Sequence, residues 1–260
     1  MGAFLALLAM LQTSGLAVQR VAVPGPEGVT LDAALIWPAG AARGTGVVAL
    51  HGCGGPFPDR DGQWAVALAR AGHTVLLPDS FGSRGLGSQC GTRDRAVTSS
   101  GLRRRDAIAA ASWLAAQRGV PAGGVALLGW SDGGSTVLAT AKAAPDVPRG
   151  LVRSFVALYP GCGATARSRD WRPLARGMIL IGEADDWTPA APCREVAARF
   201  SREIAFVVYP GAYHDFDAPG RPVRVRSGTA STASGTAHVG TNEPARQDAL
   251  ARVPAFLAGK

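Results

Sequence analysis

Six short apolar segments recur along the chain, and they constrain its fold more than any other feature. They are Gly46–His51, His73–Pro78, Gly124–Leu128, Ser154–Tyr159, Met178–Ile181 and Ile204–Tyr209. Each contains a continuous apolar run instead of an alternation of apolar and polar residues. Such runs are typical of strands that are buried on both faces of a parallel sheet. The sequence therefore predicts a parallel sheet that is covered on both sides.

Helical patterns fill the gaps between these segments, which makes the chain an alternation of strands and helices. The helical patterns cover Gly62–Ala71, Leu102–Arg118, Ser135–Ala144, Pro192–Phe200 and Glu243–Leu257. Two earlier strands, Arg20–Val23 and Leu31–Trp37, are separated by a turn rich in Pro and Gly. We therefore expect residues 19–260 to form a single α/β domain, with a doubly wound, mostly parallel sheet of about eight strands flanked by helices.

The loops at the carboxyl ends of the strands carry the chemistry of such sheets, and one of them reads GWSDGG at residues 129–134. Ser131 follows a predicted strand and precedes a predicted helix. This is the setting in which a G-x-S-x-G motif forms a nucleophile elbow. Gly129 and Gly133 leave room for the sharp turn, and the helix N-terminus favours negative charge that develops nearby. The sequence predicts that Ser131 is a nucleophile.

A serine hydroxyl needs a neighbouring base before it can attack. In folds with a nucleophile elbow, the acid and then the histidine follow the serine along the chain. His214, in YPGAYHDFD, comes directly after the last apolar segment and is the predicted base. His238 is the second candidate. It lies within residues 218–242, a stretch rich in Ser, Thr and Gly that we expect to be either disordered or a lid over the site.

The acid is expected after the strand that ends in GMILIGEADDWTP. We predict Asp185 as the partner of the histidine, with Asp186 as the alternative. Such a carboxylate holds the imidazole in the useful tautomer and stabilises its charged form. Either residue could instead cap the helix that follows.

Two backbone N–H groups are expected to bind the oxyanion of an acyl-transfer reaction. One belongs to Asp132, the residue after the nucleophile. The other is expected from the glycine-rich stretch HGCGG at residues 51–55, which follows an earlier strand, and Cys53 is its predicted donor. The alternative for HGCGG is a plain glycine-rich turn.

Together these motifs resemble the dienelactone hydrolase family of α/β-hydrolases from about residue 30 to the end. HGCGG, PDSFGSRG, GWSDGG, GEADDWTP, YPGAYHDFD and a closing helix that ends in AFL carry the resemblance. It implies an α/β-hydrolase fold, a hydrolytic triad and no metal or organic cofactor. The Asp-x-x-x-Pro spacing from Asp185 to Pro189 resembles the family's acid loop and supports Asp185.

The chain departs from the family pattern at the nucleophile, because Ser131 stands where dienelactone hydrolases have a cysteine. HGCGG also lacks a counterpart of the acidic residue that tunes that cysteine. The resemblance therefore implies the fold and the triad but not the lactone substrate. Arg84 is a candidate for binding an anionic group of the substrate, with a surface salt bridge as the alternative. Trp130 and Trp187 are candidates for lining an acyl pocket, with core packing as the alternative.

The N-terminus and the cysteines bear on the compartment of the protein. Residues 1–18 contain an apolar run of the length of a signal peptide, although no basic residue precedes it. We expect export to the periplasm or beyond; a helix packed on a cytoplasmic domain is the alternative. Four cysteines fit one or two disulfides in an exported protein, and the spacing does not choose the pairing. The four are Cys53, Cys90, Cys162 and Cys193.

The net charge of +8, from 27 basic and 19 acidic residues, does not by itself indicate a nucleic-acid partner, and we expect none. Nearly all of the basic residues are arginines, and they are scattered except for Arg103–Arg105 at the start of a predicted helix. We expect a serine hydrolase that acts on a small carboxylic ester, without a membrane span and more readily a monomer than an oligomer. A thioesterase, a small-peptide hydrolase and a non-catalytic binding protein with the same fold are the alternatives.

Overall fold

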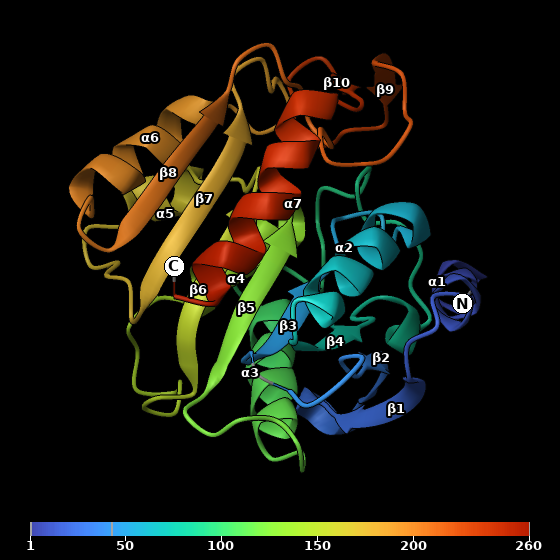
Figure 1. Cartoon of the computed structure of the whole chain (residues 1–260). Helices are drawn as coiled ribbons and strands as arrows, with labels where there is room; N and C mark the ends of the chain where they lie inside the picture. The colour runs from blue at the N-terminus through green and yellow to red at the C-terminus, as the bar shows by residue number, and fades with distance from the viewer. Residues whose placement is uncertain (1, 43, 260) are drawn as a thin grey trace.

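The computed structural model describes residues 2–42 and 44–259, and its centre is an eight-stranded sheet with the order β1-β2-β4-β3-β5-β6-β7-β8 (Figure 1). The strands are β1 (Val18–Pro24), β2 (Thr30–Ile36), β3 (Gly46–Leu50), β4 (Thr74–Pro78), β5 (Val125–Trp130), β6 (Val152–Leu158), β7 (Arg176–Gly182) and β8 (Ile204–Tyr209). Strand β2 pairs antiparallel with both of its neighbours, and β3 to β8 pair in parallel. The predicted mostly parallel sheet of about eight strands is confirmed.

Helices cover both faces of this sheet. They are α1 (Gly2–Gln12), α2 (Pro58–Arg70), α3 (Leu102–Ala115), α4 (Asp132–Thr140), α5 (Gly163–Arg167), α6 (Ala190–Arg199) and α7 (Glu243–Leu257), with single 3₁₀ turns at Pro26–Gly28 and Gly82–Arg84. Helices α2 and α7 contact each other on the face that is turned toward the viewer in Figure 1, whereas α3 and α4 contact each other behind it. The inner strands β3, β4 and β5 are therefore shielded from water on both faces.

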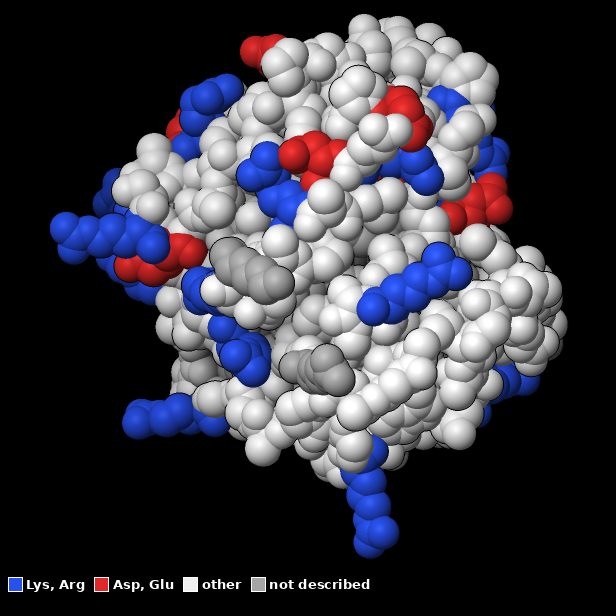
Figure 2. Space-filling view, in the orientation of Figure 1, with Lys and Arg blue, Asp and Glu red and all other residues white. Residues whose placement is uncertain are grey.

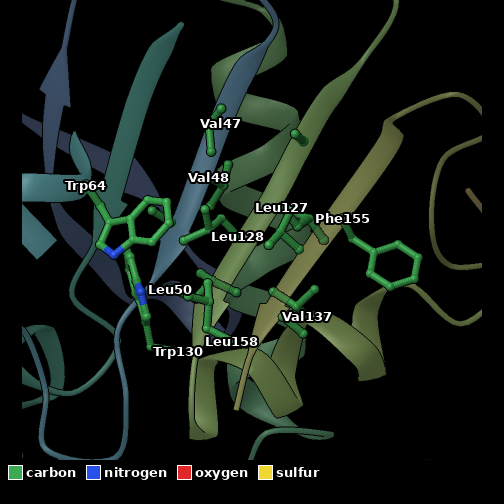
Figure 3. Packing of buried hydrophobic residues seen from close by; sticks show 14 of the residues in the cluster. Val47, Val48, Leu50, Trp64, Leu127, Leu128, Trp130, Val137, Phe155 and Leu158 are labelled. Atoms are coloured by element: carbon green, nitrogen blue, oxygen red, sulfur yellow. The ribbon is translucent and has the colours of Figure 1, made fainter. Parts of the chain in front are cut away.

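The core follows from this layering. Every residue of β3, β4 and β5 is buried, because each of these strands has a helix layer on both sides. Figure 3 shows the side chains of Trp64 and Trp130 together on one side of the sheet and Val137 on the other. The two indole rings lie 6.3 Å apart, centre to centre. Burial of these apolar surfaces is the main source of stability, at about 25 cal/mol per Å².

Residues 2–12 of the predicted signal segment form helix α1, and Met1 lies outside the described residues. Phe4, Leu7 and Leu11 of this helix are buried against the domain, and α1 contacts α2 (Figure 1). This packing matches the alternative of a helix on the domain, while cleavage of the segment stays a prediction. Within the described part of the chain, no helix is long and apolar enough to cross a membrane.

The polar stretch 218–242 is folded and lies at the carboxyl edge of the sheet. It contains a two-stranded antiparallel hairpin of β9 (Arg224–Ser227) and β10 (Thr236–Val239). Figure 1 shows this hairpin at the end of the sheet toward which β5, β7 and β8 point. The stretch is therefore not disordered, and it covers the edge of the sheet where the loops after the strands meet.

Charged side chains are spread over the surface of this domain. Figure 2 shows lysine and arginine side chains placed singly or next to acidic residues over one face. The three successive arginines at the start of α3 also separate. Arg104 pairs with Asp146 and Arg105 with Glu27, whereas Arg103 turns inward.

The four cysteines form two disulfides, Cys53–Cys90 and Cys162–Cys193. The first joins the HGCGG loop to the segment after β4, and the second joins the start of α5 to α6. Among the described residues no cysteine is free. Disulfides persist in oxidising compartments, so the pairing favours a location outside the cytoplasm.

We expect each disulfide to make a similar contribution to stability. The bridged cysteines are 37 and 31 residues apart, and closing loops of this size lowers the entropy of the unfolded chain by an amount worth about 4 kcal/mol. Urea unfolding of the Cys162→Ala/Cys193→Ala and Cys53→Ala/Cys90→Ala double variants should therefore show comparable losses in the free energy of unfolding. Wild-type stability in either double variant would contradict this expectation.

Candidate active site

Ser131 occupies a sharp turn between β5 and α4, and its backbone is strained. Its dihedral angles are φ 54° and ψ −117°, a region that residues other than glycine rarely adopt. The turn requires glycine on both sides. A Cβ atom on Gly129 would lie 2.4 Å from the carbonyl oxygen of Gly133, and one on Gly133 would lie 2.0 Å from that of Leu50. The local geometry is that of a nucleophile elbow.

The turn brings the Ser131 hydroxyl within hydrogen-bonding distance of His214. Ser131 Oγ lies 2.9 Å from His214 Nε2, and His214 Nδ1 lies 2.8 Å from Asp185 Oδ2. Asp185 follows β7 and His214 follows β8, so three separate strand ends supply the three side chains. All three are at least nine-tenths buried. This arrangement can pass the serine proton to the histidine while the carboxylate stabilises the imidazolium that forms.

The Asp185 carboxylate is held in place by its own loop. Its Oδ1 accepts hydrogen bonds from the backbone N–H groups of Trp187 and Thr188, at 2.9 and 2.8 Å. The Thr188 hydroxyl donates to Oδ2 at 3.0 Å. Asp185 therefore closes the turn before α6 and faces the histidine. Helix α6 itself begins after Pro189 without a side-chain cap, so neither Asp185 nor Asp186 has the alternative role of capping it.

Aromatic rings and the carboxylate together determine the protonation of His214. The rings of Tyr159 and Trp187 lie 4.6 and 4.7 Å from the imidazole, and they keep it out of water. This burial alone would lower the pKa of His214. The negative charge and hydrogen bond of Asp185 outweigh it, so the pKa is raised above its usual value.

The two alternative candidates, Asp186 and His238, pair with each other instead of joining this group. Asp186 accepts hydrogen bonds from the backbone N–H and from Nδ1 of His238, at 2.8 and 2.7 Å. Both side chains are more than 40% exposed. Their contact ties the loop after β7 to strand β10 of the hairpin.

Two cavities meet at Ser131. The first has a volume of about 310 Å³ and reaches from the HGCGG loop to the hairpin, where Arg224 and Arg226 line it. The second has a volume of about 710 Å³ and extends toward α5, past Ser135 and Arg167. Cys53, Ser131 and Trp187 line both. A ligand could therefore reach the serine from two sides, with one part in each cavity.

The structure does not bring all of the predicted binding residues to these cavities. Trp187 lines both of them, and its indole N–H donates to Ser231 in the hairpin stretch, at 3.0 Å. Trp130 is wholly buried below the site and lines neither cavity. Arg84 is also absent from both, because its guanidinium makes two hydrogen bonds of 2.8 Å to Asp106. The alternative of core packing therefore describes Trp130. Arg84 forms a salt bridge, as its alternative supposed, but the pair is largely buried and does not lie on the surface.

A buried polar network below His214 was not found from the sequence. Asp217 accepts hydrogen bonds from the indole N–H groups of Trp64 and Trp130 and from the Tyr159 hydroxyl, at 2.7, 3.0 and 2.6 Å. Burial raises the pKa of this carboxyl group. Because Tyr159 also packs on the imidazole, the network supports the histidine loop from beneath. The signal was present in HDFD, where a second acidic residue follows the histidine.

No group of three or more potential metal ligands occurs among residues 2–42 and 44–259. Cys53 and Asp132, the predicted oxyanion donors, both line the second cavity beside the serine. Asp132 is the first residue of α4, where the backbone N–H has no partner within its own helix.

Comparisons with known proteins identify the family and the fold. The model of the dienelactone hydrolase family matches residues 31–259. No curated protein sequence matches the chain significantly. Among solved structures, a candidate dienelactone hydrolase from Klebsiella pneumoniae has a TM-score of 0.70 at 19% identity, over 95% of this chain and 100% of its own.

Two further solved structures have the same fold. An esterase from Pyrobaculum calidifontis has a TM-score of 0.66 at 18% identity and covers 99% of this chain and 91% of its own. A dienelactone hydrolase from Anabaena variabilis has a TM-score of 0.60 at 24% identity and covers 79% of this chain and 91% of its own. At such identities the structural likeness establishes the α/β-hydrolase fold, and the family model establishes the family.

We expect the imidazole of His214 to titrate above the usual histidine pKa of about 6.5. Replacement of Asp185 by Asn should lower this pKa, because burial would no longer be opposed by a negative charge. NMR of the histidine ring protons across a pH series measures both values. An equal pKa in the wild type and Asp185→Asn would show that the carboxylate does not act on His214.

Proposed function

The chain belongs to the dienelactone hydrolase family, and we propose that it is a serine hydrolase that cleaves a carboxylic ester through Ser131, His214 and Asp185. The observation that carries this proposal is the continuous pair of hydrogen bonds from Ser131 Oγ to His214 and from His214 to Asp185. Such a relay is what converts a serine hydroxyl into a nucleophile at neutral pH.

In the proposed reaction, His214 Nε2 takes the hydroxyl proton while Ser131 Oγ attacks the ester carbonyl. The tetrahedral oxyanion accepts hydrogen bonds from the backbone N–H groups of Cys53 and Asp132. His214 then gives the proton to the departing alcohol, which leaves an acyl-enzyme. Water, deprotonated by His214, attacks the acyl group and releases the acid and the free serine. Each oxyanion donor is worth about 2.7–4 kcal/mol of transition-state stabilisation in comparable enzymes.

The same three residues could also act on thioesters or small peptides, since the chemistry differs only in the leaving group. A protein of this fold that only binds ligands is the alternative from another class. It has no need for a strained serine within 2.9 Å of a buried histidine. The strain and the burial of this group therefore favour an enzyme.

The charge of the cavities supports an anionic ester as substrate. In the first cavity, Arg60 is paired with Asp61 and Asp215, and Arg221 is paired with Asp59. Within the described chain, Arg224 and Arg226 have no carboxylate partner. Arg226 is placed by the Trp187 ring, 5.1 Å from its guanidinium carbon, and thus stands beside the site. These two arginines take the place that the sequence had given to Arg84.

We also propose that the protein is exported and works in an oxidising compartment. The support is the complete pairing of the four cysteines, together with the apolar N-terminal segment.

Fluorophosphonate labelling tests the triad directly, because this reagent phosphonylates only an activated serine. We expect an adduct on the peptide that contains Ser131, absent in Ser131→Ala and strongly reduced in His214→Ala. His238→Ala is the matched control: this exposed histidine lines neither cavity, so its loss should leave labelling as in the wild type. Folded wild-type protein without an adduct would exclude the proposed mechanism.

The substrate charge is tested with two aryl esters of equal length, one ending in a carboxylate and one in a methyl group. We expect kcat/KM to favour the anionic ester, and Arg226→Gln to reduce that preference roughly tenfold, which corresponds to about 1.4 kcal/mol. Arg105→Gln, which removes a surface arginine paired with Glu27, is the control. A preference for the neutral ester in the wild type would reject the anionic substrate while leaving the triad intact.

A further inference from the structure

Arg103, the first of the three arginines at the start of α3, is buried at the active-site edge of the sheet. It is 1% exposed, and the ring of Phe81 lies 4.8 Å from its guanidinium carbon. A buried arginine is costly unless its charge and its donors are matched by acceptors. The position of those acceptors therefore indicates what this residue is for.

The two acceptors of Arg103 lie on two different loops of the site. Its Nη2 donates to the backbone carbonyl of His51 at 2.7 Å, and its Nη1 donates to the carboxylate of Asp132. His51 opens the HGCGG loop, and Asp132 directly follows Ser131. One planar guanidinium thus bridges the two loops that carry the proposed oxyanion donors, in the fixed fork geometry that only arginine offers.

On the HGCGG loop, successive carbonyl groups are fixed by hydrogen bonds. The carbonyl of Gly52 accepts a hydrogen bond from Gly55 N at 3.2 Å and lies 2.8 Å from His51 Nδ1. In a trans peptide the C=O and N–H groups point in opposite directions, so fixing the Gly52 carbonyl also fixes the direction of the Cys53 N–H. The Cys53 carbonyl is held in turn by Gln89 N at 2.7 Å.

The side chain of His51 is suited to this task because it is neutral. Burial and the neighbouring charge of Arg103 lower its pKa to about 3. Its Nε2 accepts a hydrogen bond from Ser80 N at 3.1 Å, which leaves the proton on Nδ1 to donate to Gly52. Arg103 therefore acts on this loop twice, through the His51 carbonyl and through the His51 ring.

On the other loop, Asp132 is held from three sides. Its Oδ1 accepts from Arg95 and Ser99, at 3.0 and 2.8 Å, and its Oδ2 accepts from Arg103. Burial alone would raise the pKa of Asp132, but Arg103 and the other donors outweigh it and lower the pKa. The carboxylate is thus charged at neutral pH and is a strong acceptor for the bridge.

We propose that Arg103 is a positioning residue that sets the relative placement of the Cys53 and Asp132 N–H groups, and through it the strength of the oxyanion hole. This inference rests on the proposed function. Arg103 lines neither cavity, so it does not contact a bound substrate directly. Its effect is confined to the tetrahedral state, in which both N–H groups must reach one oxygen at about 2.7–3.1 Å.

The test compares Arg103→Met and Arg103→Lys with Arg104→Met. Arg104 is the adjacent arginine of α3; it bonds Ala139 and Asp146, and it touches neither oxyanion loop. Each folded variant is assayed for fluorophosphonate labelling rate and for kcat and KM with a p-nitrophenyl ester. Inhibition is measured with a trifluoromethyl alkyl ketone, which adds to the serine and forms an oxyanion, and with the matching methyl ketone, which binds without adding.

We expect Arg103→Met to lower kcat on the order of 10- to 100-fold. This is at most the fall in kcat that follows the removal of one whole oxyanion donor. KM should change less than about twofold. Binding of the trifluoromethyl ketone should weaken by a similar factor and that of the methyl ketone should not. Arg103→Lys, which can reach only one acceptor, should lie between Arg103→Met and the wild type. It decides the matter if Arg103→Met fails to fold.

Two results would overturn the proposal. In the first, either Arg103 variant matches Arg104→Met in all measurements. In the second, the binding of both ketones to the Arg103 variants weakens by the same factor, which would indicate a general structural role. In both cases wild-type labelling at Ser131 would keep the proposed function intact. A wild type that is not labelled at Ser131 would instead remove the proposed function, and this inference with it.

Discussion

The close contact between the turn at Ser131 and the end of β3 is the constraint on which the site depends. Gly133 lies so near to the carbonyl groups of Leu50 and His51 that no side chain fits between them. This contact lets one strand end present a serine and the adjacent strand end present the HGCGG loop. The cost is a strained residue at φ 54°. Such strain persists only where the surroundings fix the conformation, and here the wholly buried strands β3 and β5 do so.

Buried charge is the second means by which the site is held. Arg103 with Asp132, and Arg60 with Asp61 and Asp215, place ion pairs under the loops that carry the serine and the histidine. Ion pairs of this kind add little net stability, because desolvation offsets most of their attraction. Their contribution is orientation, because each guanidinium group holds hydrogen-bond acceptors on two different elements in fixed positions. A hydrophobic core of equal volume would hold the loops together without orienting their carbonyl and N–H groups.

The fold was predictable because strands that are covered on both faces must be apolar throughout. That pattern located the six parallel strands β3 to β8, including the edge strand β8, which is only partly buried, and the turn at Pro24–Gly28 located the first two. Shorter or polar elements were missed. Helix α5 spans only Gly163–Arg167, and the hairpin of β9 and β10 is rich in Ser, Thr and Gly, as loops are. The beginning of α2 at Pro58, four residues before the expected Gly62, was signalled by a proline at its first position and by Asp59 and Asp61 in its first turn.

In the candidate site, too, the positions of residues could be predicted from local sequence, whereas the directions of their side chains depend on contacts between distant parts of the chain. Ser131, Asp185 and His214 each follow a strand, so chain order could nominate them as candidates. In the structure His214 lies 2.9 Å from Ser131 Oγ and 2.8 Å from Asp185 Oδ2. Arg84 and Trp130 also stand next to motifs, yet their side chains turn to Asp106 and Asp217. A motif gives the position of a residue but not the direction of its side chain.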